Sequence, residues 1–286
     1  MRLVTYNDGH VGYLADDRVV DLGDLVGGYA NAGAHSAMRR LLETWDELRQ
    51  NLPPATAANS VALADVRLDA PIPDPSKIVA APVNYRDHKS EMEMTVDISD
   101  LAVFLKAPSS IIAHGGTIEL PYSDRRVDQE GELAAVIGRR ARNIDKADAL
   151  DYVFGYTGLL DITMRGGEDR STRKSFNTFT PLGPWLVTSD EVDPPDAIDL
   201  DCTVSGEHRQ STNTKNLIWS VAELVSYIST VMTLEVGDVI ATGTPSGVGP
   251  ITAGDEVSVT LSSIGTLAVT VASNTPGPSP TGTRKR

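Results

Sequence analysis

Three acidic side chains in expected strands form a pattern typical of a metal site. Glu130 and Glu132 lie two positions apart before an apolar run, so in a strand both point to the same face. Asp161 ends the next apolar run. Burial and mutual repulsion disfavour neighbouring charged carboxylates, and a divalent cation between them relieves both effects. Three carboxylates without clustered Cys or His indicate Mg²⁺, Mn²⁺ or Ca²⁺ rather than Zn²⁺.

The same spacing has a simpler interpretation. Two glutamates two positions apart are common on solvated strand faces. Three basic residues are available to pair with them there, namely Arg125, Arg126 and Arg139. The spacing by itself leaves both interpretations open.

Basic side chains follow the third acid and could hold the oxygens of an anionic substrate. Arg165 comes four residues after Asp161, and Lys174 comes nine residues later. The segment between them has the glycines and charges typical of a lid, although a charged surface loop has the same composition. Lys106, at the end of another expected strand, is a second candidate for a buried ammonium group.

A glycine-rich turn at residues 242–249 follows a further expected strand. Glycines such as Gly243, beside Thr244, allow backbone N–H groups to approach a ligand anion closely. The segment lacks the Gly-Lys-Ser/Thr ending of a P-loop. A tight structural turn explains it nearly as well.

A candidate base lies at His88, three residues before Glu91. On a helical turn the two side chains are neighbours, and a carboxylate beside an imidazole orients it and raises its basicity. This arrangement is suited to activating water. An exposed helical pair without a catalytic role is the alternative interpretation.

The elements that must position these groups are mostly strands. A hairpin is expected over residues 3–14, a helix over 35–50, and a capped helix from Ser220 to about residue 230. Period-2 patterns dominate elsewhere, so we predict a mixed α+β, mostly β fold with a curled or barrel-like core. The proline-rich stretch at 71–75 separates a small N-terminal α/β domain, residues 1–70, from a catalytic domain at 75–272. Residues 274–286 are predicted to be a disordered tail.

Composition excludes several classes of protein. The 286 residues carry a formal charge of −14, which disfavours binding to nucleic acid. No apolar run approaches the roughly 20 residues of a membrane helix, and the N-terminus lacks the apolar core of a signal peptide. The single cysteine, Cys202, excludes an intrachain disulfide and a cysteine-based zinc site. We therefore expect a soluble, acidic protein of the cytoplasm.

Taken in order, these segments resemble the fumarylacetoacetate hydrolase family. No single motif is decisive, but the ordered combination across about residues 75–272 is highly specific. The matching segments are residues 84–88 (NYRDH), 104–109 (FLKAPS), 130–133 (EGEL), 155–156 (GY), 161–165 (DITMR), 174–176 (KSF), 181–185 (PLGPW), 237–240 (GDVI) and 242–249 (TGTPSGVG).

The resemblance implies a β-roll or barrel-like catalytic domain behind a small N-terminal domain, usually in a homodimer. It also implies roles for individual residues. Glu130, Glu132 and Asp161 match the family's metal ligands, and His88 and Glu91 match the lid pair that activates water. The substrate is implied to contact Arg165, Lys174, Thr244 with its neighbour Gly243, and, in a less certain role, Lys106.

One position departs from the family pattern. The family often has a Gln where this sequence has Glu168, and an ionised Glu cannot donate the hydrogen bond of an amide. Glu168 could pair with Lys174 instead. This departure bears on oxyanion stabilisation and so on the hydrolase subtype.

The expected function is a reaction on a 2-keto or 2-hydroxy-dienoic acid through an enolate held on the metal. The leading hypothesis is hydrolysis of a C–C bond in an acylpyruvate-type substrate. Isomerisation of 2-hydroxyhepta-2,4-diene-1,7-dioate and decarboxylation of oxaloacetate share that intermediate and remain alternatives. A non-catalytic protein that binds a small acid is a further alternative, disfavoured because binding alone needs no base.

Overall fold

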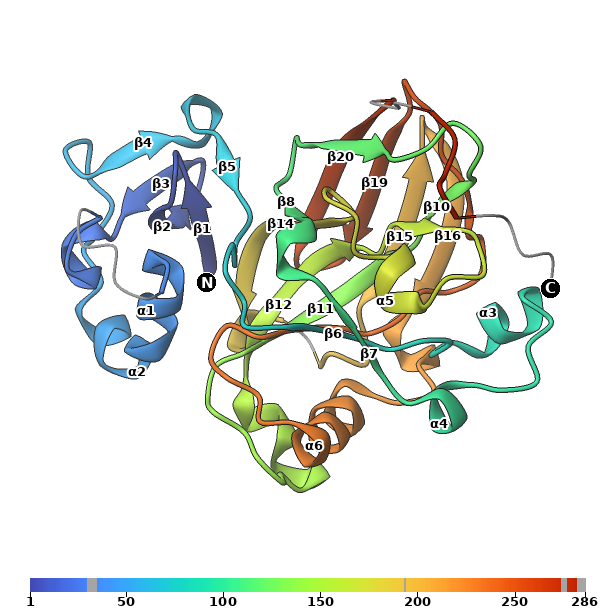
Figure 1. The fold of residues 1–286 in the computed structure, drawn as a ribbon. Coiled ribbons are helices and arrows are strands. Elements are labelled where there is room, and N and C mark those ends of the chain that lie inside the picture. The colour runs from blue at the N-terminus through green and yellow to red at the C-terminus, as the bar shows by residue number, and fades with distance from the viewer. Residues whose placement is uncertain (30–34, 193, 274–276, 282–286) are drawn as a thin grey trace.

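The protein folds mainly into β-strands arranged in three sheets, with short helices around them (Figure 1). The structure is a computed structural model that describes residues 1–29, 35–192, 194–273 and 277–281. The predicted mixed, mostly β class is confirmed. Within these ranges the sheets remain open and do not close into a barrel.

The largest sheet has twelve strands and runs through both the N-terminal part and the main body of the chain. Two short strands pair at its sides, β5 (Leu68–Asp69) with β1 and β8 (Ile111–Ile112) with β14. The remaining strands, in spatial order, are β4 (Ser60–Ala62), β3 (Arg18–Asp21), β2 (His10–Ala15), β1 (Arg2–Tyr6), β14 (Thr180–Thr188), β12 (Val153–Leu160), β11 (Gly131–Ile137), β17 (Val239–Ala241), β6 (Ile78–Ala80) and β7 (Phe104–Lys106).

Two smaller sheets complete the strand framework. One has three strands and contains the segment just before Glu130; the other has five and is formed mainly by the C-terminal part of the chain. The first consists of β13 (Thr163–Met164), β10 (Val127–Gln129) and β18 (Gly249–Pro250). The second consists of β16 (Glu207–Asn213), β15 (Asp199–Val204), β19 (Glu256–Leu261), β20 (Gly265–Ser273) and β9 (Thr117–Leu120).

The helices are short. The helix expected over 35–50 is divided at Thr44, and the capping box of Ser220 and Glu223 is confirmed at the start of the longest one. No helix in the described ranges is long and apolar enough to cross a membrane. The helices are α1 (Ala37–Glu43), α2 (Trp45–Leu48), α3 (Arg86–Glu91), α4 (Ile98–Leu101), α5 (Arg170–Arg173) and α6 (Val221–Val231), and the 3₁₀ turns are Gly23–Val26, Arg49–Asn51, Leu63–Asp65, Pro108–Ser110, Lys146–Tyr152, Ser189–Glu191 and Thr214–Asn216.

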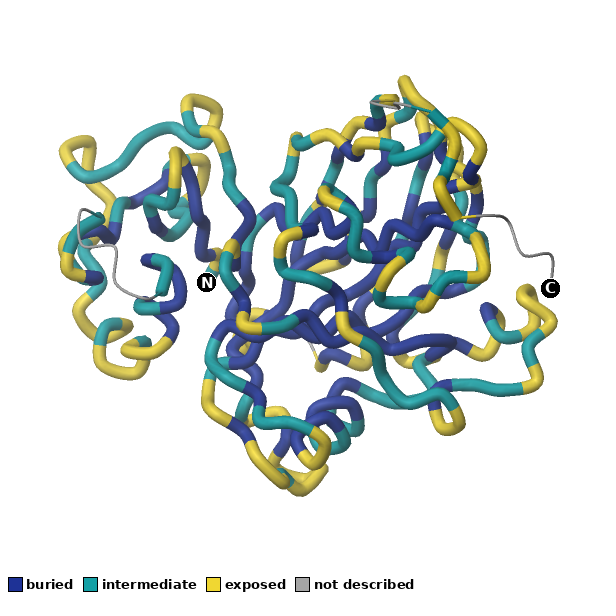
Figure 2. Tube along the Cα trace, viewed as in Figure 1, coloured by how far each residue is buried: buried dark blue, intermediate teal, exposed yellow. Residues whose placement is uncertain are grey.

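Strand β11 lies at the centre of the core and is buried along its whole length (Figure 2). Alternate residues of a strand face opposite sides of the sheet, so Leu133 and Ala135 pack into one apolar cluster while Ala134 and Val136 pack into another. Central strands covered on both faces read as continuous apolar runs. This burial on both faces fixes the strand that carries Glu132.

The N-terminal part is joined to the main body by backbone pairing as well as packing. Strand β1 pairs antiparallel with β14, and Leu3 shares an apolar cluster with Leu159 and Val239. The domain boundary near residue 71 remains a prediction. Of the tail predicted to be disordered, residues 274–276 and 282–286 lie outside the described residues, and 277–281 contact the main body.

Candidate metal centre and active site

The three predicted carboxylates come from two neighbouring strands of the large sheet. Glu132 lies in β11, Glu130 lies in the single-residue gap between β10 and β11, and Asp161 directly follows β12. The antiparallel register sets Glu132 opposite Leu159. The Asp161 N–H also donates to the Glu130 carbonyl at 2.8 Å. Strand pairing therefore brings together acids that are about thirty positions apart in the chain.

The geometry of these acids fits one divalent cation. One carboxylate oxygen from each of Glu130, Glu132 and Asp161 lies within 4.8 Å of the others, and all three residues are buried. Oxygens that each bind one hard cation at about 2.0–2.6 Å lie at most about 5 Å apart. The donor set contains only oxygen, which suits Mg²⁺, Mn²⁺ or Ca²⁺.

Basic side chains form ion pairs with two of the three acids, Glu130 and Asp161, and among the described residues none pairs with Glu132. Lys174 Nζ lies 2.7 Å from Glu130 Oε2 and 2.5 Å from Asp161 Oδ2, and Arg165 Nη2 lies 3.1 Å from Glu130 Oε1. Burial raises the pKa of Glu130, but Lys174, Arg165 and His88 outweigh burial and lower it to about 2.

Glu132 is the uncompensated acid of the triad. Its Oε2 accepts a 2.8 Å hydrogen bond from the Gly243 N–H. Burial, followed by the nearby charge of Asp161, raises the pKa of Glu132 well above its ordinary value. A divalent cation bound among these oxygens would stabilise the charged form of Glu132 and lower its pKa again, which agrees with the geometric fit of such a cation.

Lys106 and Lys174 are both buried, and their surroundings differ. Lys106 Nζ contacts Asp161 Oδ1 and donates to the Phe179 carbonyl at 2.9 Å. Burial lowers the pKa of Lys106. The pKa of Lys174 is raised in spite of burial, because two carboxylates and the Thr163 hydroxyl accept from it. Lys106 therefore pairs with Asp161 alone, whereas Lys174 bridges Glu130 and Asp161.

The simpler interpretation of the two glutamates is wrong. Arg125 contacts Glu168, Arg126 lies 2.6 Å from Asp128, and Arg139 lies 3.0 Å from Asp46. None of the three pairs with Glu130 or Glu132. The guanidinium that pairs with Glu130 is that of Arg165. It also pairs with Asp128, an acid that was not predicted from the sequence to belong to the site.

The predicted base pair forms on helix α3. His88 is buried, and its Nδ1 lies 3.3 Å from Glu91 Oε2. Glu91 Oε1 accepts from the Gly247 N–H at 2.9 Å, and Ser246 Oγ donates to Asp87 at the same distance. The glycine-rich turn thus holds α3 in place. The charge of His88 is one of the causes that lower the pKa of Glu130.

The two predicted anion contacts in the glycine-rich turn have partners in the protein. Gly243 donates to Glu132, and its φ of +98° together with the nearby Asn84 Cβ favours glycine here. Thr244 Oγ1 donates to the Gly131 carbonyl and accepts from Gln210 Nε2. Gln210, which sequence reasoning missed, is about 80 positions from Gly131, and no local pattern points to it. Contact of Gly243 or Thr244 with a substrate remains a prediction.

The proposed pairing of Glu168 with Lys174 is wrong. Glu168 Oε1 contacts Arg125 Nη2 and accepts from Thr281 Oγ1 at 2.6 Å. Arg125 Nη2 also donates to the Thr281 carbonyl at 2.8 Å. The carboxylate is turned toward the C-terminal segment, because an arginine and a hydroxyl there satisfy it, while Lys174 is already taken by Glu130 and Asp161.

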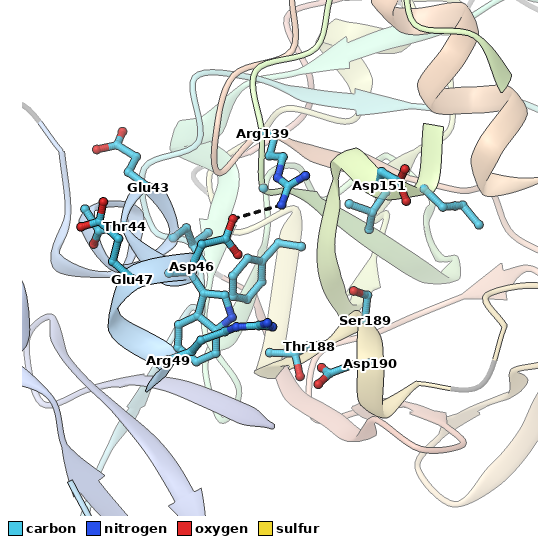
Figure 3. A pocket seen from close by; sticks show the side chains of 16 residues that line it. Glu43, Thr44, Asp46, Glu47, Arg49, Arg139, Asp151, Thr188, Ser189 and Asp190 are labelled. Carbon is cyan, nitrogen blue, oxygen red and sulfur yellow. Dashed lines mark hydrogen bonds and ion pairs between the residues drawn. The ribbon is translucent and has the colours of Figure 1, made fainter. Parts of the chain in front are cut away.

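A cavity of about 530 Å³ lies elsewhere, between α2 and the main body (Figure 3). Its walls include Trp45 and Phe154, with ring centroids 5.4 Å apart, and the ion pair of Asp46 with Arg139. The residues that line it include none of the predicted catalytic, metal or substrate residues. The carboxylate triad rather than this cavity defines the candidate active site.

The protein belongs to the fumarylacetoacetate hydrolase family. Residues 77–272 match the family model described as fumarylacetoacetate (FAA) hydrolase C-terminal, which confirms the family predicted from the motifs. The matched range contains all ten predicted site residues, from His88 to Thr244.

Several relatives are similar over nearly the whole chain. Maleylpyruvate hydrolase of Aquipseudomonas alcaligenes is 39% identical, covering 96% of this chain and all of that protein. Oxaloacetate tautomerase YisK of Bacillus subtilis is 37% identical, covering 92% of this chain and 96% of the relative. A crystal structure of maleylpyruvate hydrolase from Sphingobium sp. SYK-6 in complex with manganese(II) ion and pyruvate is 36% identical, with a TM-score of 0.86 and coverage of 96% and 99%.

Proposed function

We propose that this protein is a divalent-metal-dependent enzyme that hydrolyses the C–C bond between C3 and C4 of an acylpyruvate. The observation that carries the proposal is the buried triad of Glu130, Glu132 and Asp161 together with the His88–Glu91 pair formed on α3. Full-length similarity to two maleylpyruvate hydrolases supports the same reaction class. The products would be pyruvate and a carboxylic acid.

Glu130, Glu132 and Asp161 are proposed to hold the cation, with Mn²⁺ or Mg²⁺ as the first choice. When bound, it would supply Lewis-acid polarisation of the carboxylate and 2-oxo group at the pyruvyl end. The manganese(II) and pyruvate of the Sphingobium structure support this choice of ligand and ion. Lys106, paired with Asp161, is proposed to keep that carboxylate charged and oriented.

His88 is proposed to be the general base. Its Nδ1 faces Glu91, so its Nε2 is the nitrogen left to take a proton from water. The oxygen of that water adds to C4, the C3–C4 bond breaks, and its electron pair remains on the pyruvyl fragment, which becomes pyruvate when C3 is protonated. Glu91 stabilises the imidazolium and is itself held by Gly247.

Lys174 and Arg165 are proposed to balance the negative charge that develops at the carbonyl oxygen. Both lie against Glu130, and Lys174 also contacts Asp161. Glu168 does not serve here, since its carboxylate is bonded to Arg125 and Thr281.

A tautomerase is the second candidate, favoured by the 37% identity to oxaloacetate tautomerase over 92% of the chain. The same proton-accepting pair could move a proton between C3 and the 2-oxo group without adding water. The experiment must also distinguish three remaining alternatives: isomerisation of a 2-hydroxydienoate, decarboxylation of oxaloacetate, and binding without turnover.

The test is product analysis with Mn²⁺-loaded protein. We expect acylpyruvates such as maleylpyruvate to yield pyruvate and the free acid, observed by proton NMR, and we expect EDTA to stop the reaction. If the protein exchanges the enol and keto forms of oxaloacetate and cleaves no acylpyruvate, its function is tautomerisation and not hydrolysis. Unchanged cleavage in excess EDTA would contradict the metal-dependent mechanism.

Two further proposals concern the state of the protein in cells. We propose a homodimer, as the family resemblance implies, and light scattering should then give twice the 30.5 kDa of one chain. A monomeric mass at micromolar concentration would contradict this proposal.

We also propose a cytoplasmic location, supported by a single cysteine that is free and buried. Fractionation of cells would test this location.

A further inference from the structure

Gln210 is the only buried residue of strand β16, whose other residues are partly or fully exposed. Residues two apart in a regular strand share a face, so Gln210 would be expected to face solvent together with His208. In the pairing with β15, however, these two residues lie opposite consecutive residues, Cys202 and Thr203. The extra residue between them, Arg209, forms a β-bulge, and such a bulge re-aims the neighbouring side chain. The bulge therefore turns one amide of an otherwise exposed strand into the protein.

The amide of Gln210 joins strand β11 to the glycine-rich turn. Its Oε1 accepts from the Gly131 N–H at 2.9 Å, and its Nε2 donates to Thr244 Oγ1 at 2.8 Å and to the Pro245 carbonyl at 2.9 Å. Thr244 Oγ1 in turn donates to the Gly131 carbonyl at 2.9 Å. Gln210, Thr244 and Gly131 thus form a closed ring of hydrogen bonds. Because Gly131 lies between the two glutamates of the triad, the ring fixes the main chain that carries both of them.

The same turn continues to helix α3, which carries the candidate base. The N–H of Gly247, later in the turn, donates to Glu91 Oε1 at 2.9 Å, and Glu91 is the partner of His88. A Cβ on Gly247 would lie 1.9 Å from the Arg209 carbonyl oxygen, so the backbone of β16 lies directly against the turn. The contacts therefore lead from Gln210 to the metal-ligand strand in one direction and to the base in the other.

Among the described residues, none of the side-chain hydrogen bonds of Gln210 stays within its own sheet. A residue that served only the five-stranded sheet would not need partners in β11 and in the turn. We propose that Gln210 is a positioning residue that holds the metal-ligand strand and the base helix in register with each other. The proposal rests on the proposed function, in which these two elements act on one substrate. Small displacements of reacting groups, of about 1 Å, are enough to slow a reaction strongly.

The first test uses Gln210→Met, which keeps the length of the side chain and removes all three of its hydrogen bonds. In the metal-free protein, hydrogen exchange should become faster at the amides of α3, because the turn that holds this helix is loosened. Calorimetry should show the affinity for Mn²⁺ lowered about 10-fold, as for other groups that orient metal ligands. At saturating Mn²⁺, kcat for maleylpyruvate should fall about 10-fold with KM little changed.

Thr214→Val is the matched control, because Thr214 is buried just after β16 and its Oγ1 accepts from the Ile198 N–H at 3.0 Å, away from the turn and from β11. It should lower stability to urea and leave Mn²⁺ affinity and α3 exchange as in wild type. The proposal is overturned if Gln210→Met loses stability alone, or if Thr214→Val changes affinity and exchange equally. Gln210→Asn, which keeps the amide on a shorter side chain, should show smaller changes of the same kind and serves if Gln210→Met does not fold.

A second test examines the ring itself and does not depend on turnover. Thr244→Val removes the hydroxyl that links the Gln210 amide to the Gly131 carbonyl. Because both side chains act through the same ring, the double variant should lose less Mn²⁺ affinity than the product of the two single losses. Losses that multiply would overturn the proposal. If the wild-type protein binds Mn²⁺ but cleaves no acylpyruvate, the proposed function fails, while Mn²⁺ affinity and α3 exchange still decide the role of Gln210.

Discussion

The carboxylate triad and the helix that carries the candidate base are built in different ways. Glu132 and Asp161 are fixed by the ladder between β11 and β12, in a core buried on both faces. His88 lies instead on α3, a helix of six residues. The part that would hold a metal is thus rigid, whereas the part that would supply the base depends on a few polar contacts.

Because the two regions are held differently, substitutions in them should have different effects. Contacts that hold α3, such as Ser246 with Asp87 and Gly247 with Glu91, are exposed hydrogen bonds and open at low free-energy cost. The ion pairs around the triad are buried, and breaking one leaves an uncompensated charge. Changes on α3 should alter turnover, and changes at the triad should alter stability and metal affinity.

The largest effect on turnover is expected for substitution of His88, the proposed base. His88→Ala should lower kcat about 10²- to 10⁴-fold, because proton removal from water loses its acceptor, while the affinity for Mn²⁺ stays close to that of wild type. Steady-state kinetics and calorimetry on the same preparation measure both. Glu91→Gln, which keeps the shape of the partner, should cost less than His88→Ala. Unchanged turnover in His88→Ala would exclude the imidazole as the base.

The second prediction concerns the buried charge of Lys106. Lys106→Met removes one of the two ammonium groups paired with Asp161, with little change in volume, and should lower the free energy of unfolding by about 1 to 3 kcal/mol. Urea denaturation without metal measures this loss. Added Mn²⁺ should restore more stability to Lys106→Met than to wild type, because the cation replaces the missing charge. Equal unfolding midpoints for both proteins without metal would show that the pair carries no net stability.

The smallest effect is expected at the C-terminal segment. Thr281→Val removes the hydroxyl shared by Glu168 and Arg125 and should cost less than about 1 kcal/mol of stability. Hydrogen exchange should rise locally in residues 165–169, and Thr281→Ser should behave as wild type. Unaltered exchange in Thr281→Val would mean that this contact does not restrain the segment.

The sequence predicted the parts of the site that depend on local spacing. Glu130 and Glu132 lie two positions apart at the start of β11, Asp161 directly follows the paired strand β12, and His88 and Glu91 share a helical turn, so each of these features lies within or next to one element or one strand pair. The capping box at Ser220 is local in the same sense. These features follow from backbone geometry that few tertiary contacts can override.

The features that the sequence did not predict depend on distant pairings. Glu168 pairs with Arg125, which is 43 positions away, and not with the nearby Lys174. The burial of the Arg173 Nε without a hydrogen-bond partner among the described residues is likewise revealed only by the folded arrangement. Competition among several charges for the same few acids is decided by packing, which spacing does not encode.

The central claim, that the triad holds a divalent cation, is tested most directly by calorimetric titration of Mn²⁺ into chelator-stripped protein. Wild type and the control Glu207→Gln, which changes an exposed acid on β16, should each bind Mn²⁺. Glu132→Gln, which keeps the shape of the side chain and removes its charge, should lose at least about 100-fold in affinity. Equal affinity of Glu132→Gln and wild type, or no binding by wild type, would contradict the account.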